Sequence, residues 1–96
     1  MRWQLQDVRV RPGALEQYAA EWRAAVAPAR VEAGFSVVGP WLVPEESRFL
    51  WILGYDGDFA AADAAFDAPR RPELDPDRLV VETAVLFMED PRAAAP

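Results

Sequence analysis

Apolar and polar side chains alternate along residues 2–10, and this period of two is typical of a β-strand. The Pro12-Gly13 pair that follows is a turn signal and predicts the end of the strand. Both faces of the strand carry apolar side chains, so we expect each face to meet a packed layer. One face carries Trp3 and Leu5, and the other carries Gln4, Gln6, Val8 and Val10.

The next segment, residues 14–34, has the period of a helix, because its apolar residues recur every three or four positions. Pro28 lacks a backbone donor, so we expect the helix to kink or end there. Gly34 is suited to cap its C-terminus. The apolar face holds Leu15, Tyr18, Ala19, Trp22, Ala25, Val26 and Ala29.

Two strands are predicted next, over residues 35–43 and 48–56, with the polar turn Pro44–Ser47 between them. So short a connection predicts a hairpin. Gly39-Pro40 interrupts the first of these strands, which indicates a bulge or a position at the edge of the sheet.

A second helix is predicted to start after Asp58, which is suited to cap its N-terminus, and to end at Pro69. A loop rich in proline and charge leads to the last strand, residues 79–90. The order strand, helix, strand, strand, helix, strand predicts an α+β, ferredoxin-like βαββαβ sandwich. Its four-stranded antiparallel sheet would carry both helices on one face. We expect one domain, residues 1–91, and a flexible tail, residues 92–96.

The third and fourth strands are apolar on both faces, whereas an antiparallel sheet with one wet face alternates. Left bare, the second face would be a large apolar patch that monomers rarely tolerate. We therefore predict a homodimer through the sheet face, in which the same face of two copies packs about a two-fold axis. In the third strand we expect Leu50 and Ile52 to meet the helices. The second subunit would then meet Phe49, Trp51, Leu53 and Tyr55.

The composition limits the possible partners and chemistry. The chain has 96 residues, with 10 basic and 16 acidic side chains and a net charge of −6, which argues against nucleic acid or an anionic membrane as partner. It has no cysteine and no histidine, so thiolate and imidazole chemistry are excluded, and we predict no metal and no cofactor. No apolar run is long enough for a membrane span, and the first residues lack the apolar core of a signal peptide. We expect a cytoplasmic protein.

Three stretches, "WQLQDVRVRPG", "GFSVVGPWLV" and "FLWILGYDGDFAAADAAFDAP", resemble the NIPSNAP family in order and spacing. The resemblance covers nearly all of residues 1–91. It implies a place in the dimeric α/β-barrel superfamily, in which two ferredoxin-like sheets face each other around a shared cavity. Relatives there include cofactor-free monooxygenases of antibiotic biosynthesis, haem enzymes and proteins without known activity.

Two hypotheses about function follow from the resemblance. The first is that the cavity between the sheets binds a hydrophobic or aromatic small molecule and that the protein acts on it as a cofactor-free oxygenase or cyclase of bacterial secondary metabolism. The second is a non-catalytic binding or accessory protein. Fold alone does not decide between these hypotheses.

Glu82 and Tyr55 are the candidate catalytic residues. Glu82 is the one carboxylate on a strand face that otherwise holds Val80, Ala84, Leu86 and Met88. Buried there, it would have a raised pKa and could transfer a proton near neutral pH. The alternatives are an ion pair with an arginine, or a position in water near the end of the strand.

The candidate ligand-binding residues are Gln4, Gln6, Trp41, Arg48 and Trp51. The glutamines would supply polar groups in an apolar cavity, or they could face solvent. The aromatic residues would line the cavity or pack the dimer interface, and Arg48 would meet an anionic ligand or cap a turn. Trp3 and Trp22 are predicted to be core residues.

Overall fold

The computed structural model describes residues 1–67 and 76–89. Its strands are β1 (Arg2–Val10), β2 (Ser36–Val43), β3 (Arg48–Tyr55) and β4 (Val80–Met88). Its helices are α1 (Leu15–Glu21), α2 (Ala27–Glu32) and α3 (Phe59–Asp67), with a π-helical segment at Trp22–Val26 and 3-10 turns at Pro44–Glu46 and Pro76–Leu79. No helix among these residues is long and apolar enough to span a membrane. The predicted tail, residues 92–96, and Pro69 lie outside the described residues.

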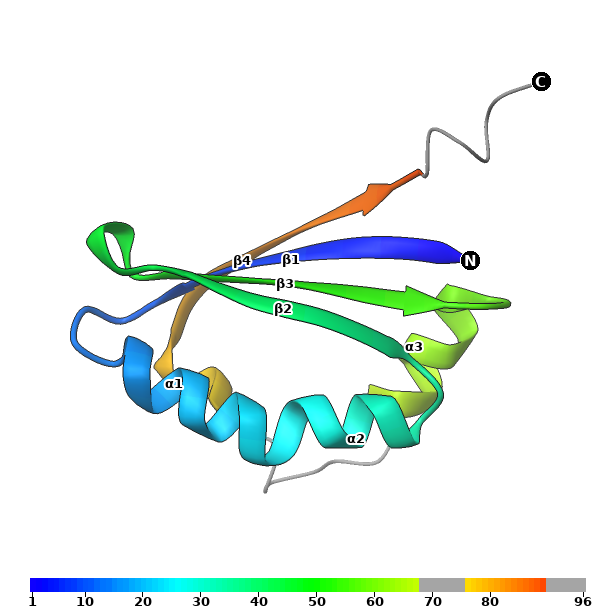
Figure 1. The fold of residues 1–96 in the computed structure, drawn as a ribbon, viewed down its shortest axis with the longest axis horizontal. Helices are drawn as coiled ribbons and strands as arrows, with labels where there is room; N and C mark the ends of the chain where they lie inside the picture. Colours follow the sequence, from blue (N-terminus) through cyan, green and yellow to red (C-terminus); the bar gives the residue numbers. More distant parts are fainter. Residues whose placement is uncertain (68–75, 90–96) are drawn as a thin grey trace.

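The four strands form one antiparallel sheet in the order β2-β3-β1-β4. Figure 1 shows the helices on one side of this sheet, while the other side carries none. We call the side toward the helices the inner face and the other side the open face. The predicted ferredoxin-like sandwich is therefore confirmed, including the place of β2 at an edge.

The first helix runs past Pro28 and does not end there. Pro28 is the second residue of α2 and has no N–H to give to the turn before it. The turn before it is widened into the π-helical segment, in which the Ala27 N–H reaches back to the Trp22 carbonyl. At the far end Gly34 has φ 96°, and the Phe35 N–H donates to the Arg30 carbonyl. This is the glycine C-cap that the sequence predicts.

Two further sequence signals are also confirmed. The Asp58 carboxylate accepts the Ala61 N–H at 3.0 Å and so caps α3. The pairing of β2 with β3 slips between Val38 and Trp41, so Gly39-Pro40 forms a bulge on an edge strand.

The aromatic side of β3 packs on the helices, and this corrects the predicted assignment of its two faces. Phe49, Trp51 and Leu53 are between 0% and 5% exposed and belong to the core. The Phe49 ring lies 5.0 Å from Tyr18 and 5.1 Å from Trp22, edge to face. Aromatic rings on the helix thus meet aromatic rings on the strand, and this leaves Leu50 and Ile52 on the open face.

Trp3 also differs from its prediction, since it lies on the open face and not in the core. It pairs with Gly54, and its ring covers that glycine so closely that an added Cβ would lie 2.5 Å from it. A glycine is required at position 54 because no side chain fits beneath the indole.

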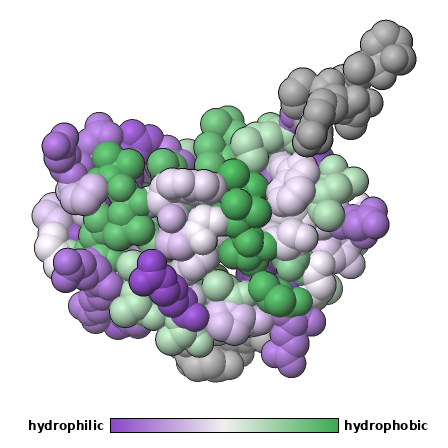
Figure 2. Space-filling model, in the orientation of Figure 1, coloured by the Kyte–Doolittle hydropathy of each residue, from purple (hydrophilic) through white to green (hydrophobic). Residues whose placement is uncertain are grey.

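The open face carries apolar side chains at the surface of the single chain. Leu86 is 62% exposed, Trp41 50% and Val38 41%. Apolar side chains reach the surface in several patches in the view of Figure 2. The dimer was predicted from the sequence because this apolar face would otherwise be exposed to solvent.

Candidate functional site

The seven candidate residues lie on two opposite faces of the sheet. Residues paired across an antiparallel ladder share a face, so the strand pairing assigns each of them. Gln4, Gln6, Trp51 and Tyr55 are on the inner face, and Trp41, Arg48 and Glu82 are on the open face. They do not form one site.

Gln4 and Gln6 form a polar pair between the sheet and the helices. Gln4 is 6% exposed and is the one buried polar residue among those described. The Gln6 side-chain amide donates to the Gln4 side-chain carbonyl. Neither glutamine faces open solvent as the alternative interpretation held, because helices cover this side of β1.

Two tryptophans extend this polar group. Trp51 pairs directly with Gln6 across β3 and β1, and its ring lies 5.3 Å from Trp22, edge to face. The indole nitrogens of Trp22 and Trp51 are both buried, and neither has a hydrogen-bond partner among the described residues. A buried donor without a partner costs about 1–3 kcal/mol. Such groups are rare in native proteins, and each calls for an explanation such as an ordered water, an ion or a functional role.

The inner face is incompletely covered over β4. Val85 pairs with Gln6 and Phe87 pairs with Gln4, so both belong to the inner face, yet they are 48% and 47% exposed. Phe87 packs on Phe59 at 5.3 Å, and the Arg2 guanidinium lies 3.7 Å from its ring. Two half-exposed apolar side chains therefore lie beside the glutamine pair in the sheet, with the Arg2 cation next to one of them.

Tyr55 lies at the end of β3 on the same face but packs against other residues. Its ring is half-buried and lies 5.0 Å from Phe35. It lines the end of the core next to the turn into α3.

Arg48 lies in an ion-pair network on the open face. Its guanidinium binds the Asp7 carboxylate through two hydrogen bonds and contacts Glu46 at 3.3 Å. Asp7 first, and Glu46 after it, raise the pKa of Arg48 further above its already high ordinary value, so Arg48 remains charged. Arg48 was expected to meet an anionic ligand, but its guanidinium is already bound to the Asp7 carboxylate.

Glu82 is not buried, although its predicted role in proton transfer required burial. Its side chain is 67% exposed and lies 3.9 Å from Arg9, which matches the ion-pair alternative. A bulge between Arg9 and Val10 also moves Val80 to the inner face, so Val80 and Glu82 do not share a face. Together with Asp7, Arg9, Arg48 and Ala84, Glu82 lines a hollow of about 130 Å³.

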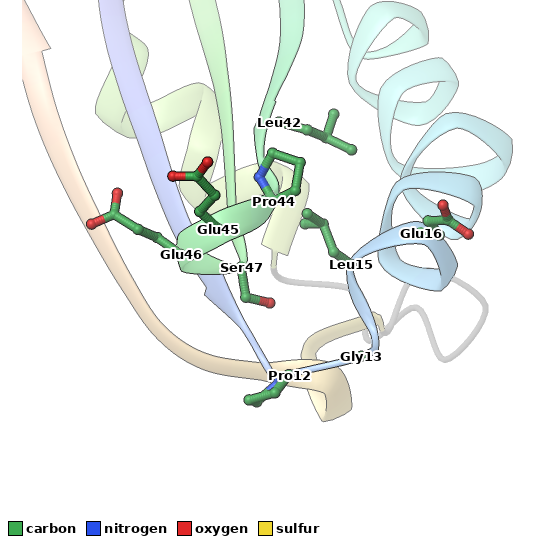
Figure 3. A pocket seen from close by; sticks show the side chains of 9 residues that line it. All are labelled: Pro12, Gly13, Leu15, Glu16, Leu42, Pro44, Glu45, Glu46 and Ser47. Atoms are coloured by element: carbon green, nitrogen blue, oxygen red, sulfur yellow. The ribbon is translucent and has the colours of Figure 1, made fainter.

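A larger hollow of about 540 Å³ lies at the hairpin end of the molecule, where no candidate residue had been placed. Figure 3 shows the Leu15 side chain pointing from α1 toward Pro44, whereas the Glu46 side chain points away from α1. The hollow lies between the start of α1 and the turn after β2. Its lining is Pro12, Gly13, Leu15, Glu16, Leu42, Pro44, Glu45, Glu46 and Ser47.

Trp22 is the site residue that the sequence analysis assigned to the core alone. Its position on the helix stripe predicts burial correctly but does not show that its indole nitrogen lacks a partner. The signal that could have found it is the pattern of paired polar residues on β1. Two glutamines on a buried face imply further polar groups nearby. Among the described residues, no group of three or more carboxylates is arranged to hold a metal ion.

No protein-family model matches the chain, and no curated protein matches it in sequence. Solved structures do match in fold. A NIPSNAP family protein of unknown function from Agrobacterium tumefaciens superposes with a TM-score of 0.76 at 17% identity, covering 92% of this chain and 86% of that one. An uncharacterized NIPSNAP domain protein from Burkholderia xenovorans gives a TM-score of 0.75 at 13% identity, with 94% of each chain covered.

A protein described as an antibiotic biosynthesis monooxygenase is also similar. Its TM-score is 0.66 at 14% identity, with 94% of this chain and 98% of that one covered. At such identities the likeness concerns fold alone. The chain therefore has the ferredoxin-like fold of NIPSNAP family proteins, which confirms, at the level of fold, the resemblance seen in its sequence.

Proposed function

We propose that this protein is a homodimer that binds a small aromatic molecule in each subunit, between the inner face of the sheet and the helices. The site is formed by Gln4, Gln6, Trp22 and Trp51, and it opens over Val85 and Phe87 of β4. This differs from the predicted cavity between two sheets, because four of the seven candidate residues lie on the helix side.

The observation that carries the proposal is the pair of buried indole N–H donors without partners beside a buried amide pair. A ligand that accepts hydrogen bonds there would remove the cost of these donors. The surrounding rings favour a flat apolar body. The ligand class is thus an aromatic molecule with a carbonyl or similar oxygen. Amide and indole side chains do not ionise near neutral pH and so cannot act as general acids or bases. The site therefore supports binding first.

The binding test uses two probes of equal ring size, 1,4-naphthoquinone and naphthalene, of which only the first has acceptor oxygens. The chain has neither cysteine nor lysine to react with a quinone. We expect calorimetry to show naphthoquinone binding about tenfold more tightly than naphthalene. Gln4→Leu should reduce that preference, while Gln17→Leu, an exposed site on α1, should keep it. Equal affinity for the two probes, or no binding of either, would refute the site.

The dimer is tested separately. The open face bears Leu86, while the helix layer bears the similarly exposed Val31, at 62% and 58%. We expect light scattering to show a dimer at micromolar concentration. Leu86→Glu should weaken it and Val31→Glu should not. A wild-type chain that stays monomeric, or a dimer indifferent to Leu86→Glu, would reject the interface.

A second candidate function is cofactor-free oxygenation of the bound molecule. The shared fold with a protein described as an antibiotic biosynthesis monooxygenase and the aromatic surroundings of the inner site favour it. Anthrone with one O₂ would give anthraquinone and water, so the substrate supplies the electrons and no cofactor is needed. The test compares the rate of oxygen uptake with anthrone for the wild-type protein and for the Gln4→Leu variant. If the wild-type rate is no faster, the oxygenase function is rejected and the protein is a binding or accessory protein.

A further inference from the structure

Arg2 is the one charged residue on the inner face of the four strands. It stands in β1 two positions before Gln4 and pairs with Tyr55 of β3. Arg2, Gln4 and Gln6 therefore follow one another along the same side of β1. Arg2 is exposed and Gln4 is buried, so this side of β1 runs from a cation at the surface to the amide pair inside.

The guanidinium of Arg2 is held by an aromatic ring and not by a carboxylate. Its Cζ lies over Phe87 of β4, 3.7 Å from the ring centroid. A ring attracts a cation through its π electrons but offers no oxygen acceptor, so the N–H donors of Arg2 stay available. No carboxylate in residues 1–67 or 76–89 forms an ion pair with it. The arginines that do pair with carboxylates there are Arg9, Arg30, Arg48 and Arg78.

This cation lies within the length of a small ligand from the unpartnered indole donor of Trp51. Phe87 pairs with Gln4 on one side of β1, and Trp51 pairs with Gln6 on the other side. Two such positions are two strands and one repeat of the strand apart, which separates them by about 12 Å. A hydrogen bond at each end takes up about 3 Å, so about 6 Å remains between the two polar groups of a ligand that spans them.

We propose that the ligand of the inner site is an aromatic carboxylate. Its carboxylate binds Arg2, while a carbonyl oxygen about 6 Å away accepts hydrogen bonds from the buried indoles. This inference rests on the proposed function and adds the charge of the ligand and the spacing of its polar groups. The flat guanidinium can form two parallel hydrogen bonds with a carboxylate, which a neutral amide cannot match. A cationic aromatic molecule would be repelled at the same place.

The test uses two probes that differ in charge, 1,4-naphthoquinone-6-carboxylate and 1,4-naphthoquinone-6-carboxamide. Both keep the ring body and the quinone oxygens of the probe that tests the site itself. We expect calorimetry to show the carboxylate binding about fivefold or more tightly than the amide, because its pair with Arg2 forms at an exposed edge. The preference should shrink at high salt, since salt screens the pair.

Two variants distinguish the role of Arg2 from a general effect of charge. Arg2→Gln should weaken binding of the carboxylate to the level of the amide and leave binding of the amide unchanged. Because the amide reports on the intact site, its unchanged affinity also shows that this variant is folded. Arg23→Gln removes the same charge from an exposed position in the π-helical segment and should keep the preference.

The outcomes separate this inference from the proposed function. In a protein that binds 1,4-naphthoquinone, equal affinity for the two derivatives, or no binding of either, would overturn the carboxylate ligand and leave the inner site standing. A preference for the carboxylate that survives Arg2→Gln would do the same. A protein that binds none of the three quinones would overturn both.

Discussion

Replacing Gly54 with alanine should destabilise the protein through one identifiable clash. An alanine Cβ would lie 2.5 Å from Cζ3 and 2.6 Å from Cε3 of Trp3, where ordinary contact needs about 3.4 Å. The indole must therefore move by about 1 Å or leave its rotamer. Overpacking of this kind costs about 1–3 kcal/mol.

The cost should disappear when Trp3 is removed. In a Trp3→Ala background, Gly54→Ala has free space above it. Alanine restricts the unfolded chain more than glycine does, so the substitution should be neutral or stabilising by up to about 1 kcal/mol. The double-mutant cycle should thus give a coupling energy of at least about 1 kcal/mol.

Urea unfolding followed by far-UV circular dichroism measures all four proteins of the cycle. Since Trp3 lies on the face proposed for dimerisation, the series must be run at one protein concentration and repeated at a second. The reasoning fails if Gly54→Ala costs the same with and without the indole, or if it costs nothing in the wild-type background.

The remaining predictions concern the core and one surface ion pair. Phe49→Ala removes a fully buried ring that contacts Tyr18 and Trp22, and should lower the free energy of unfolding by about 3–5 kcal/mol, with a smaller loss measured for Phe49→Leu. The Arg78 guanidinium, by hydrogen bonding to Glu21, holds the pKa of that carboxyl below its ordinary value of 4.5. Because the pKa of Glu21 is lower in the folded protein than in the unfolded chain, the ion pair stabilises the folded protein at pH values above the ordinary pKa. This stabilisation is lost as the pH falls through the pKa that Glu21 has in the folded protein. NMR titration of wild type and Arg78→Gln should show the Glu21 pKa rising in the variant, and an unchanged pKa would refute the pairing.

The fold could be predicted from the sequence because local signals agreed with one another. Strand period, helix period and the caps at Gly34 and Asp58 all point to the same element order. The face assignment of β3 could not be predicted, because every residue from Phe49 to Leu53 is apolar and a period of two carries no signal when both faces are apolar. The deciding information lies in Tyr18 and Trp22, which belong to another element.

The candidate site was predicted in part for the same reason. Strand parity correctly placed Gln4 and Gln6 together, since parity is a local property. Parity also placed Glu82 on the same face as Val80. The bulge next to Arg9 shifts the strand pairing by one residue, so the two side chains lie on opposite faces. No local pattern shows whether a carboxylate has an arginine opposite it on the next strand, so the exposed pair with Arg9 could be named only as an alternative.

The bulge on β2 also bears on whether the sheet can recruit further strands. An edge strand offers its unpaired N–H and C=O groups to any extended chain, and a regular edge is an aggregation hazard. At β2 the ladder is broken after Val38, and Pro40 has no N–H to offer. Within the described part of the chain, β4 forms the other edge, and it runs unbroken from Glu82 to Met88 in its pairing with β1. Uncontrolled strand addition should therefore start at β4, and aggregates should form there when that edge is left uncovered.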